Sequence, residues 1–347
     1  MSLSEDKVRF VLIGCGKISR NHIAGVRRIS DVAELVGVCD PNEERARAAA
    51  DAAGGVPHFT SIETMLEQTK AHCGIVGTPS GMHPEHAALV AQAGLHVITE
   101  KPMAVSTAAA DAMLKAVRDA GTQLFVIKQN RLLPSVQALH GALRRDAFGR
   151  LLMGQVNVFW TRPQAYYDEA PWRGTWAMDG GAFLNQASHY IDLLQWFFGP
   201  VQSVQAHVAT MGRDIEAEDS GIALVRFTSG AVASINVTML TYPKNLEGSI
   251  TVLGERGTAK LTGRGLAEIA AWDLEDEPAL GELPSMPSGP GAGHEPYFRN
   301  VVDVIQGRAD PSTSGEEARK SLELIEAIYL SSREGRVVTL PLQSADS

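Results

Sequence analysis

The chain has 347 residues, more than a single hydrophobic core usually holds, so we expect two domains. Its composition is that of a globular protein, with 44% hydrophobic and 20% charged residues. The formal net charge of -9 argues against a nucleic-acid partner, because such binding depends on clustered Lys and Arg.

The cysteines and apolar runs predict the compartment. Cys15, Cys39 and Cys73 lie in or beside apolar stretches, without a CxxC pair or metal-ligand spacing, so we expect reduced core thiols and no metal site. The N-terminus lacks the pattern of a signal peptide, and no run reaches the ~18 apolar residues of a membrane span. We therefore expect a cytoplasmic protein with no membrane partner.

The first 130 residues alternate between apolar runs and helical patterns. Apolar runs that are typical of buried parallel strands lie at 8–14, 34–40, 72–79, 95–102 and 123–130. Helical patterns lie between them, at about 18–29, 41–54, 84–93 and 107–120. This alternation predicts an α/β Rossmann domain, a doubly wound parallel sheet, over residues 1–128.

The pattern changes after Arg131. A helix near 134–144 precedes alternating strand patterns with short turns, at 151–161, 201–210, 220–230, 231–240 and 248–261. They predict an α+β domain over residues 129–347 with an open-faced, mostly antiparallel sheet. Residues 280–295 are expected to form a loop, and 315–332 an amphipathic helix that can pack back toward the Rossmann domain.

A glycine turn after the first strand predicts a dinucleotide site. Residues 14–19, GCGKIS, match G-x-G-x-x-G except for Ser19; Gly14 allows the tight turn and Gly16 lets backbone approach a pyrophosphate. Asp40, at the end of the second strand, can accept both ribose hydroxyls and would repel a 2′-phosphate, which favours NAD over NADP. The alternative is a plain glycine turn with an acidic helix cap.

The ends of the later strands should complete this site, because open α/β sheets bind ligands at the carboxyl ends of their strands. TPSGMH at 78–83 and EKP at 100–102 lie there and should border the nicotinamide. The full set predicted to bind NAD is Gly14, Gly16, Lys17, Ile18, Asp40, Thr78, Pro79, His83, Glu100, Lys101 and Gln129.

The stretch DGGAFLNQASHYID, residues 179–192, places a glycine pair before an apolar helix. Asn185 and His189 lie one turn apart on that helix and should share a face. Spacing alone leaves open whether they form a self-satisfied polar pair or part of an active site.

Together, Gly14-Cys15-Gly16, Thr78-Pro79, Glu100-Lys101-Pro102 and the helix with Asn185 and His189 resemble the glucose-fructose oxidoreductase / inositol dehydrogenase / MocA family over nearly the whole chain. The resemblance implies a nicotinamide-dependent enzyme that acts on sugar or cyclitol hydroxyl groups, and a cis Lys101-Pro102 peptide bond. In the family pattern GGGxxxDxGxH, Asp179 replaces the first glycine and Asn185 the aspartate, whereas Lys101 and His189 match.

Oxidation of a secondary alcohol requires a base for the hydroxyl proton. His189, with an ordinary pKa near 6.5, suits this role, and Lys101 could stabilise the oxygen or, with its pKa lowered beside the cationic nicotinamide, act as the base itself. We favour His189 as base and leave the reverse open. Asn185 would orient substrate or imidazole, and Asp192 would support the ring. The alternatives are a solvated lysine and a structural histidine.

Within the family, the runs at 127–131, 157–168, 172–176, 180–196 and 238–255 are most similar to the UDP-N-acetyl-2-amino-2-deoxyglucuronate 3-dehydrogenases of bacterial O-antigen (lipopolysaccharide) biosynthesis. The resemblance implies oxidation of the 3′-hydroxyl of UDP-2-acetamido-2-deoxy-glucuronate by NAD. It also implies cofactor that co-purifies as NADH, re-oxidation by 2-oxoglutarate, and a homotetramer formed through the open sheet face.

A substrate with a diphosphate and a carboxylate requires local cations, which Arg supplies in bidentate form, and aromatic rings can stack on uracil or sugar. Besides Lys101, Asn185 and His189, the predicted substrate-binding residues are Arg131, Arg162, Tyr167, Trp172, Arg173, Tyr242 and Lys244, with Tyr166 as a further ring. Which cation meets which anion is left open.

Two other functions remain possible. A dehydrogenase of the same family that acts on a free sugar or inositol would not need the Arg and aromatic cluster at 162–176. A noncatalytic NAD-binding sensor would not need Lys101 and His189.

Overall fold

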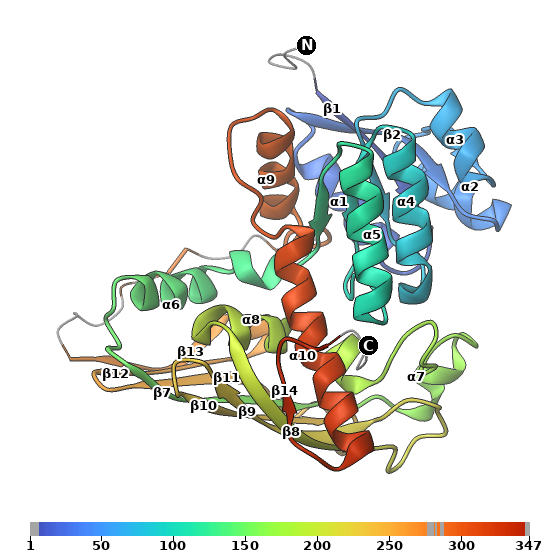
Figure 1. Cartoon of the computed structure of the whole chain (residues 1–347). Coiled ribbons are helices and arrows are strands. Elements are labelled where there is room, and N and C mark those ends of the chain that lie inside the picture. The colour runs from blue at the N-terminus through green and yellow to red at the C-terminus, as the bar shows by residue number, and fades with distance from the viewer. Residues whose placement is uncertain (1–6, 276–280, 282, 285–287, 344–347) are drawn as a thin grey trace. The chain divides into compact units, whose positions relative to one another are not determined.

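The computed structural model describes residues 7–275, 281, 283–284 and 288–343, and these fall into two compact units (Figure 1). The first unit contains the chain up to Ala104, then Ala108–Leu132, and a third segment that ends at Ala318. The second contains most of residues 133–275 and 319–343. The third segment of the first unit differs from the predicted division, which assigned everything after residue 128 to the second domain.

The first unit is built on a six-stranded sheet in which every neighbouring pair is parallel. The strands lie in the order β3 (His58–Phe59), β2 (Ala33–Cys39), β1 (Val8–Ile13), β4 (Cys73–Val76), β5 (His96–Thr99) and β6 (Leu124–Val126). The connecting helices are α1 (Ser19–Arg28), α2 (Glu43–Ala52), α3 (Ile62–Gln68), α4 (His83–Gln92) and α5 (Thr107–Asp119). The doubly wound Rossmann sheet is thus confirmed.

Helix α9 (Glu295–Ile305) explains why a distant segment joins the first unit. Its residues Tyr297, Phe298 and Val301 are buried in the same core cluster as Phe10 of β1 and Ile23 of α1. The predicted loop 280–295 lies partly outside the described residues, and α9 begins at its last residue. The predicted helix 315–332 is confirmed as α10 (Gly315–Glu334).

The second unit is built on an eight-stranded sheet that is mostly antiparallel. The strand order is β13 (Glu268–Leu274), β12 (Gly257–Thr262), β11 (Glu247–Gly254), β7 (Leu151–Phe159), β10 (Val232–Thr238), β9 (Ser220–Phe227), β8 (Val201–Ala209) and β14 (Val338–Thr339). Strands β7 and β10 pair in parallel, and the other pairs are antiparallel. Helices α6 (Pro134–Arg144) and α8 (Ser188–Phe198) lie over one face in Figure 1. The α+β class is confirmed.

The opposite face of this sheet is open in Figure 1, with no helix of the described residues over it. Alternate residues of the central strands point to that face and leave apolar side chains in solvent. Met153 of β7 is 49% exposed, Val232 of β10 44%, and Ile222 and Leu224 of β9 56% and 58%. The pairing register places these four side chains close together on one surface.

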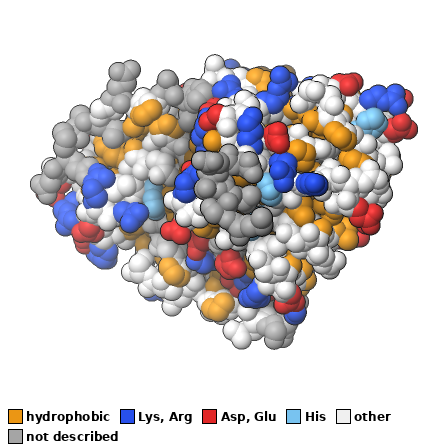
Figure 2. All heavy atoms as spheres, turned by 90° about the horizontal axis from the view of Figure 1, so that it is seen from above, with side chains coloured by type: hydrophobic (Ala, Val, Ile, Leu, Met, Phe, Trp, Pro, Cys, Tyr) orange, Lys and Arg blue, Asp and Glu red, His pale blue; other side chains and the backbone are white. Residues whose placement is uncertain are grey.

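Burial and surface charge agree with the composition. Cys15, Cys39 and Cys73 are buried and form no disulfide, and burial raises the pKa of Cys15 to about 12 and that of Cys39 to about 11. Basic and acidic side chains are interspersed on the face that Figure 2 shows. No helix in the described part of the chain has both the length and the apolar character needed to cross a membrane.

Candidate active site

The loop between β1 and α1 has the geometry of a phosphate-binding turn. Gly14 has a φ of +93°, and a Cβ atom there would lie 2.7 Å from the carbonyl oxygen of Gly77. A Cβ at Gly16 would meet nothing within 4 Å, so backbone is open to a ligand at this position. The loop lies where β1 and β4 are adjacent, which is the point of the sheet at which such folds bind dinucleotides.

Asp40 is held in a fixed orientation by two backbone groups. Its side chain is buried, and its carboxylate accepts hydrogen bonds from the N–H of Cys15 and the N–H of Asn42, both at 2.9 Å. Each carboxylate oxygen retains a further acceptor position, which suits the two hydroxyls of a ribose. Oε1 of Gln129 is buried without a hydrogen-bond partner among the described residues, so a donor from a ligand could satisfy it. These residues fit NAD.

His83 contacts backbone through both of its ring nitrogens. Its Nδ1 lies 2.8 Å from the carbonyl oxygen of Pro102, and its Nε2 lies 2.8 Å from that of Thr78. Both ring nitrogens are therefore engaged by backbone, and the ring is buried. The ring thus links the 78–79 loop to the cis Lys101-Pro102 bond, which is present as the resemblance implied, and direct contact of His83 with NAD stays a prediction.

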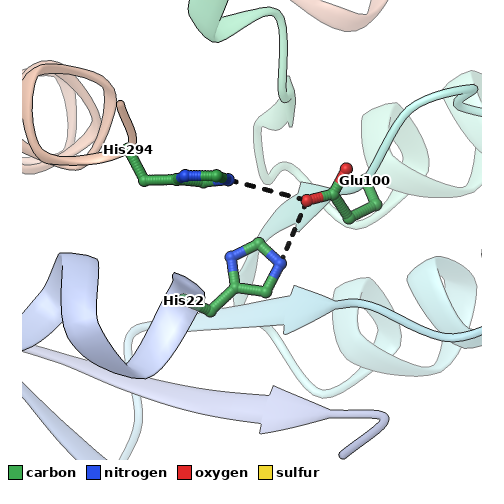
Figure 3. Close-up of side chains that lie close together, drawn as sticks. All are labelled: His22, Glu100 and His294. Carbon is green, nitrogen blue, oxygen red and sulfur yellow. Dashed lines mark ion pairs between the residues drawn. The ribbon is translucent and has the colours of Figure 1, made fainter. Parts of the chain in front are cut away.

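Three side chains from distant parts of the first unit, His22, Glu100 and His294, lie close together in Figure 3. Nε2 of His22, from α1, lies 3.1 Å from Oε1 of Glu100, and Nε2 of His294, at the start of α9, lies 3.8 Å from the same oxygen. Oε2 of Glu100 accepts the N–H of Lys101 at 3.1 Å. The two imidazoles thus orient the carboxylate that holds the backbone of Lys101.

The charge of Glu100 is stabilised by these imidazoles. Burial opposes ionisation, but the contacts with His22 and His294 outweigh it and hold the pKa of Glu100 well below its ordinary value. Burial lowers the pKa of His22 in spite of its contact with Glu100. The donor atoms lie within 4.8 Å of one another and are of types that transition metals bind. The same contacts, however, already supply the buried carboxylate with its partners.

The helix predicted to follow the glycine pair at 180–181 is interrupted. Residues Ala182–Gln186 form a π-helical turn, η3, in which the N–H of Ala187 donates to the carbonyl oxygen of Ala182. Helix α8 begins only at Ser188, so Asn185 and His189 do not lie on one continuous α-helix as expected. The sequence pattern missed this break because contacts from outside the segment hold the turn. Such turns are frequent at functional sites.

Asn185 is oriented from both sides. Its Nδ2 donates to Oδ1 of the buried Asp179, and its Oδ1 accepts from Nε2 of Gln186 at 3.3 Å. Asp179 also accepts the N–H of Gly174 at 2.8 Å. The two departures from the family pattern are therefore partners: the carboxylate lies at position 179 and the amide at position 185.

The predicted proton-transfer residues belong to different units. His189 is the second residue of α8 and half-buried, and Asp192 is buried one turn later on the same helix. Lys101 belongs to the first unit and is half-buried after β5.

An arginine and aromatic cluster lies in the second unit. Cζ of Arg173 lies 4.4 Å from the ring centre of Tyr166 and 4.9 Å from that of Trp172. Cζ of Arg162 lies 5.5 Å from the same Tyr166 ring. Gln186 links the cluster to the Asn185 turn, because it accepts from Nε of Arg162 at 3.1 Å and donates to the Tyr166 hydroxyl at 3.1 Å.

This cluster carries a local excess of positive charge. The side chain of Arg173 is 12% exposed, and its Nη2 lies 3.6 Å from Oε2 of Glu169. Nε of Arg173 is buried without a hydrogen-bond partner among the described residues. Two guanidinium groups against one ring form a site that favours an anion.

The other predicted substrate residues lie outside this cluster or have another role. Tyr167 is buried and packs edge-on against Tyr166, so it supports that ring. Arg131 is buried in the first unit, with Nη1 3.9 Å from Oε2 of Glu317. Tyr242 is 95% exposed, and Lys244 is exposed in the same loop.

Four residues that support these sites gave little or no signal in the sequence: His22, His294, Glu218 and Tyr329. The two histidines gave no local pattern, because their partner Glu100 is far away in the sequence. Glu218 gave a weak one, since an acid pair directly precedes the strand pattern at 220–227.

The comparisons with known proteins agree with this geometry. A model described as "Oxidoreductase family, NAD-binding Rossmann fold" matches residues 8–128, and one described as "Oxidoreductase family, C-terminal alpha/beta domain" matches residues 141–340. The D-apiose dehydrogenase of Paraburkholderia graminis is 30% identical over 97% of this chain and 90% of its own length.

Two solved structures are more similar. The WlbA dehydrogenase of Chromobacterium violaceum, in complex with NADH and UDP-GlcNAcA, is 49% identical with a TM-score of 0.92, over 99% of this chain and 98% of that one. The WlbA dehydrogenase of Bordetella pertussis, with the same two ligands, is 50% identical with a TM-score of 0.90, over 97% of this chain and 100% of that one.

Proposed function

Because the chain belongs to the glucose-fructose oxidoreductase / inositol dehydrogenase / MocA family and is an NAD-dependent dehydrogenase, we propose that it oxidises the 3′-hydroxyl of UDP-2-acetamido-2-deoxy-glucuronate to a ketone. The observation that carries this proposal is the near-50% identity, over almost the whole length, to two dehydrogenases bound to UDP-GlcNAcA.

The cluster around Tyr166 supports a substrate that carries two anionic groups, a diphosphate and a carboxylate. A free sugar or inositol carries no charge, so it offers nothing to repay the desolvation of two guanidinium groups. A diphosphate or a carboxylate does, through bidentate hydrogen bonds to Arg162 and Arg173. The half-buried rings of this segment, Tyr166 and Trp172, can stack on uracil or sugar.

Each residue then has a role in the reaction. His189 accepts the proton of the 3′-hydroxyl, while the ammonium group of Lys101 stabilises the oxygen as negative charge develops on it. Bound NAD supplies the hydride acceptor. Asn185, fixed by Asp179 and Gln186, orients the substrate or the imidazole. The carboxylate of Asp40 holds the adenosine ribose.

Three further parts of the proposal rest on the resemblance alone. The enzyme would keep its cofactor as NADH and re-oxidise it with 2-oxoglutarate. It would supply a sugar for bacterial O-antigen, and it would work as a homotetramer assembled through the open sheet face.

The test is a turnover panel of purified protein with NAD and 2-oxoglutarate. UDP-2-acetamido-2-deoxy-glucuronate should be oxidised, whereas UDP-N-acetylglucosamine, which lacks the carboxylate, D-apiose and inositol should react at least about a hundredfold more slowly in kcat/KM. Arg173→Gln should remove most of the advantage of the acid. Turnover of a free sugar at the higher rate would replace the proposal with the family alternative.

A further inference from the structure

The turn η3 is held by two side chains from elsewhere in the second unit. A helical turn begins with N–H groups that have no partner within it. Here the N–H of Ala182 donates to the carbonyl oxygen of Glu218 at 2.9 Å, and the N–H of Phe183 donates to Oε1 of Glu218 at 2.8 Å. The N–H of Leu184 donates to the hydroxyl oxygen of Tyr329, from α10, at 3.2 Å. All three groups are therefore capped from outside the segment.

The two capping side chains also bind each other. The hydroxyl group of Tyr329 donates to Oε1 of Glu218 at 3.0 Å, so one carboxylate oxygen accepts from both the turn and the tyrosine. Trp176 packs edge-on against the Tyr329 ring, with ring centres 5.1 Å apart. These contacts hold the half-buried Tyr329 ring in place beside the turn.

Glycine at position 181 is required by this arrangement. Gly181 has an extended backbone, so its conformation alone would admit any residue. A Cβ atom there, however, would overlap Oε2 of Glu218. The second glycine of the DGG sequence is therefore explained by the close approach of a carboxylate to the backbone.

Glu218 is an unusual group to bury in this way. It forms no ion pair with Lys or Arg in the described part of the chain, and its Oε2 has no hydrogen-bond partner there. Burial raises the pKa of Glu218 to about 7, although the hydrogen bonds from Phe183 and Tyr329 oppose the rise. A buried acid kept at such a cost is typical of a functional region.

We propose that Glu218 and Tyr329 are positioning residues for the reaction: they fix η3, and with it Asn185 and the start of α8, which carries His189. The role rests on the proposed function, because it places the two residues behind the groups that meet the substrate. Neither side chain is proposed to touch the substrate. An error of about 1 Å in such positions can reduce turnover about a hundredfold.

Four variants test this proposal. Glu218→Gln keeps an oxygen that can accept from Phe183 and Tyr329, whereas Glu218→Leu keeps the approximate size and removes both acceptors. Tyr329→Phe removes a single oxygen atom and tests the pair independently, including the case in which Glu218→Leu does not fold. Ser331→Ala is the matched control, since it removes a buried hydroxyl group from the same helix. That hydroxyl accepts from the N–H of Ala206 and donates to the carbonyl oxygen of Arg336.

Two measurements are made on each variant: hydrogen–deuterium exchange of the peptide that covers 182–190, and kcat with the KM for NAD. Glu218→Leu and Tyr329→Phe should speed exchange of this peptide and lower kcat at least about tenfold, with the KM for NAD unchanged. In Glu218→Gln the exchange rate of this peptide and kcat should both stay near the wild-type values, and Ser331→Ala should change neither.

Unchanged exchange in both disruptive variants would overturn the proposal, as would faster exchange without loss of kcat. An equal loss in Ser331→Ala would also overturn it. If the wild-type protein oxidises no UDP-sugar acid, the proposed function fails, but the exchange measurement still decides whether Glu218 and Tyr329 hold the turn. Turnover is then measured with whichever substrate the protein oxidises.

Discussion

Lys101 and His189 are the two titratable side chains to which we assign the chemistry at the reacting hydroxyl. They reach their positions by different means. Lys101 precedes a cis bond to Pro102, and the backbone of these two residues is held by Glu100 and His83. His189 is the second residue of a helix that follows a capped turn. In both cases a titratable side chain is attached to a backbone that neighbouring groups hold in place.

We predict that Lys101→Ala and His189→Asn each lower kcat by about 10²- to 10⁴-fold, because a positioned acid or base contributes that much. Binding of NAD, measured by quenching of tryptophan fluorescence, should change little. Lys115→Ala, which removes an exposed lysine paired with Asp119, should match the wild type. Wild-type kinetics in both site variants would disprove the assignment.

At this scale, local residues were predictable and remote partners were not. Gly14 and Asp40 could be assigned from the sequence, because a tight turn and an acid at a strand end express their roles within a short stretch. The two carbonyl partners of His83 were not predictable, since they become visible only when residues 78 and 102 are brought together. The departures from the family pattern at Asp179 and Asn185 were visible in the sequence, but the hydrogen bond between the two side chains was not.

At the scale of elements, the π-helical turn η3 is the main departure from the predicted structure. The apolar spacing of residues 182–194 favours a continuous helix, and nothing in it marks a break. The break depends on Glu218 and Tyr329, which lie far along the chain. Strands β1, β2, β4, β5 and β6 were predictable because each lies in a mostly apolar run of the sequence; β3 has two residues and gave no pattern.

Gly181→Ala tests the space around Glu218. The added methyl group would overlap a buried carboxylate, so we predict a loss of about 1 to 3 kcal/mol of unfolding free energy together with a loss of turnover. Gly141→Ala in α6 is the control: its methyl group would meet only the end of the Arg145 side chain, at 3.3 Å. The control should leave stability unchanged or raise it by about 0.5 to 1 kcal/mol.

The raised pKa of Glu218 predicts a pH dependence of stability. Because the folded state favours the protonated acid, the contribution of this group is present below pH 4.5 and is lost as pH rises through about 7. The shift from 4.5 to about 7 corresponds to about 3 kcal/mol. Glu218→Gln, which is neutral at every pH, should therefore become more stable than the wild type between pH 5 and pH 8.

Denaturation by urea at four pH values measures this difference. Glu216→Gln, which removes a charge from a nearby exposed residue, is the control and should show no such trend. A gap between Glu218→Gln and the wild type that stays constant with pH would contradict the assignment of a raised pKa.

At the scale of the whole molecule, the open face of the eight-stranded sheet remains the largest feature without a partner in the described chain. Met153, Ile222, Leu224 and Val232 place apolar surface there, and such patches on soluble proteins mark interaction sites. The sequence predicted this face from the alternation of its strands, but alternation cannot specify the number of copies that cover it.

We expect a second copy of this chain to cover that face. Ile222→Glu combined with Leu224→Glu should lower the mass measured by light scattering after size-exclusion chromatography, because charges cannot be buried without partners. Met211→Glu, at an exposed apolar residue in the loop between β8 and β9, should leave the mass unchanged. A wild-type protein that runs as a monomer would remove the basis of this prediction.

The position of oxidation is the central claim, and isotope transfer tests it most directly. UDP-2-acetamido-2-deoxy-glucuronate with deuterium at C3 of the sugar is incubated with the enzyme and NAD, and the recovered NADH is weighed by mass spectrometry. We predict NADH that is one mass unit heavier, and unlabelled NADH from substrate with deuterium at C4. Unlabelled NADH from the C3-labelled substrate, or label transferred from C4, would contradict oxidation at the 3′-hydroxyl.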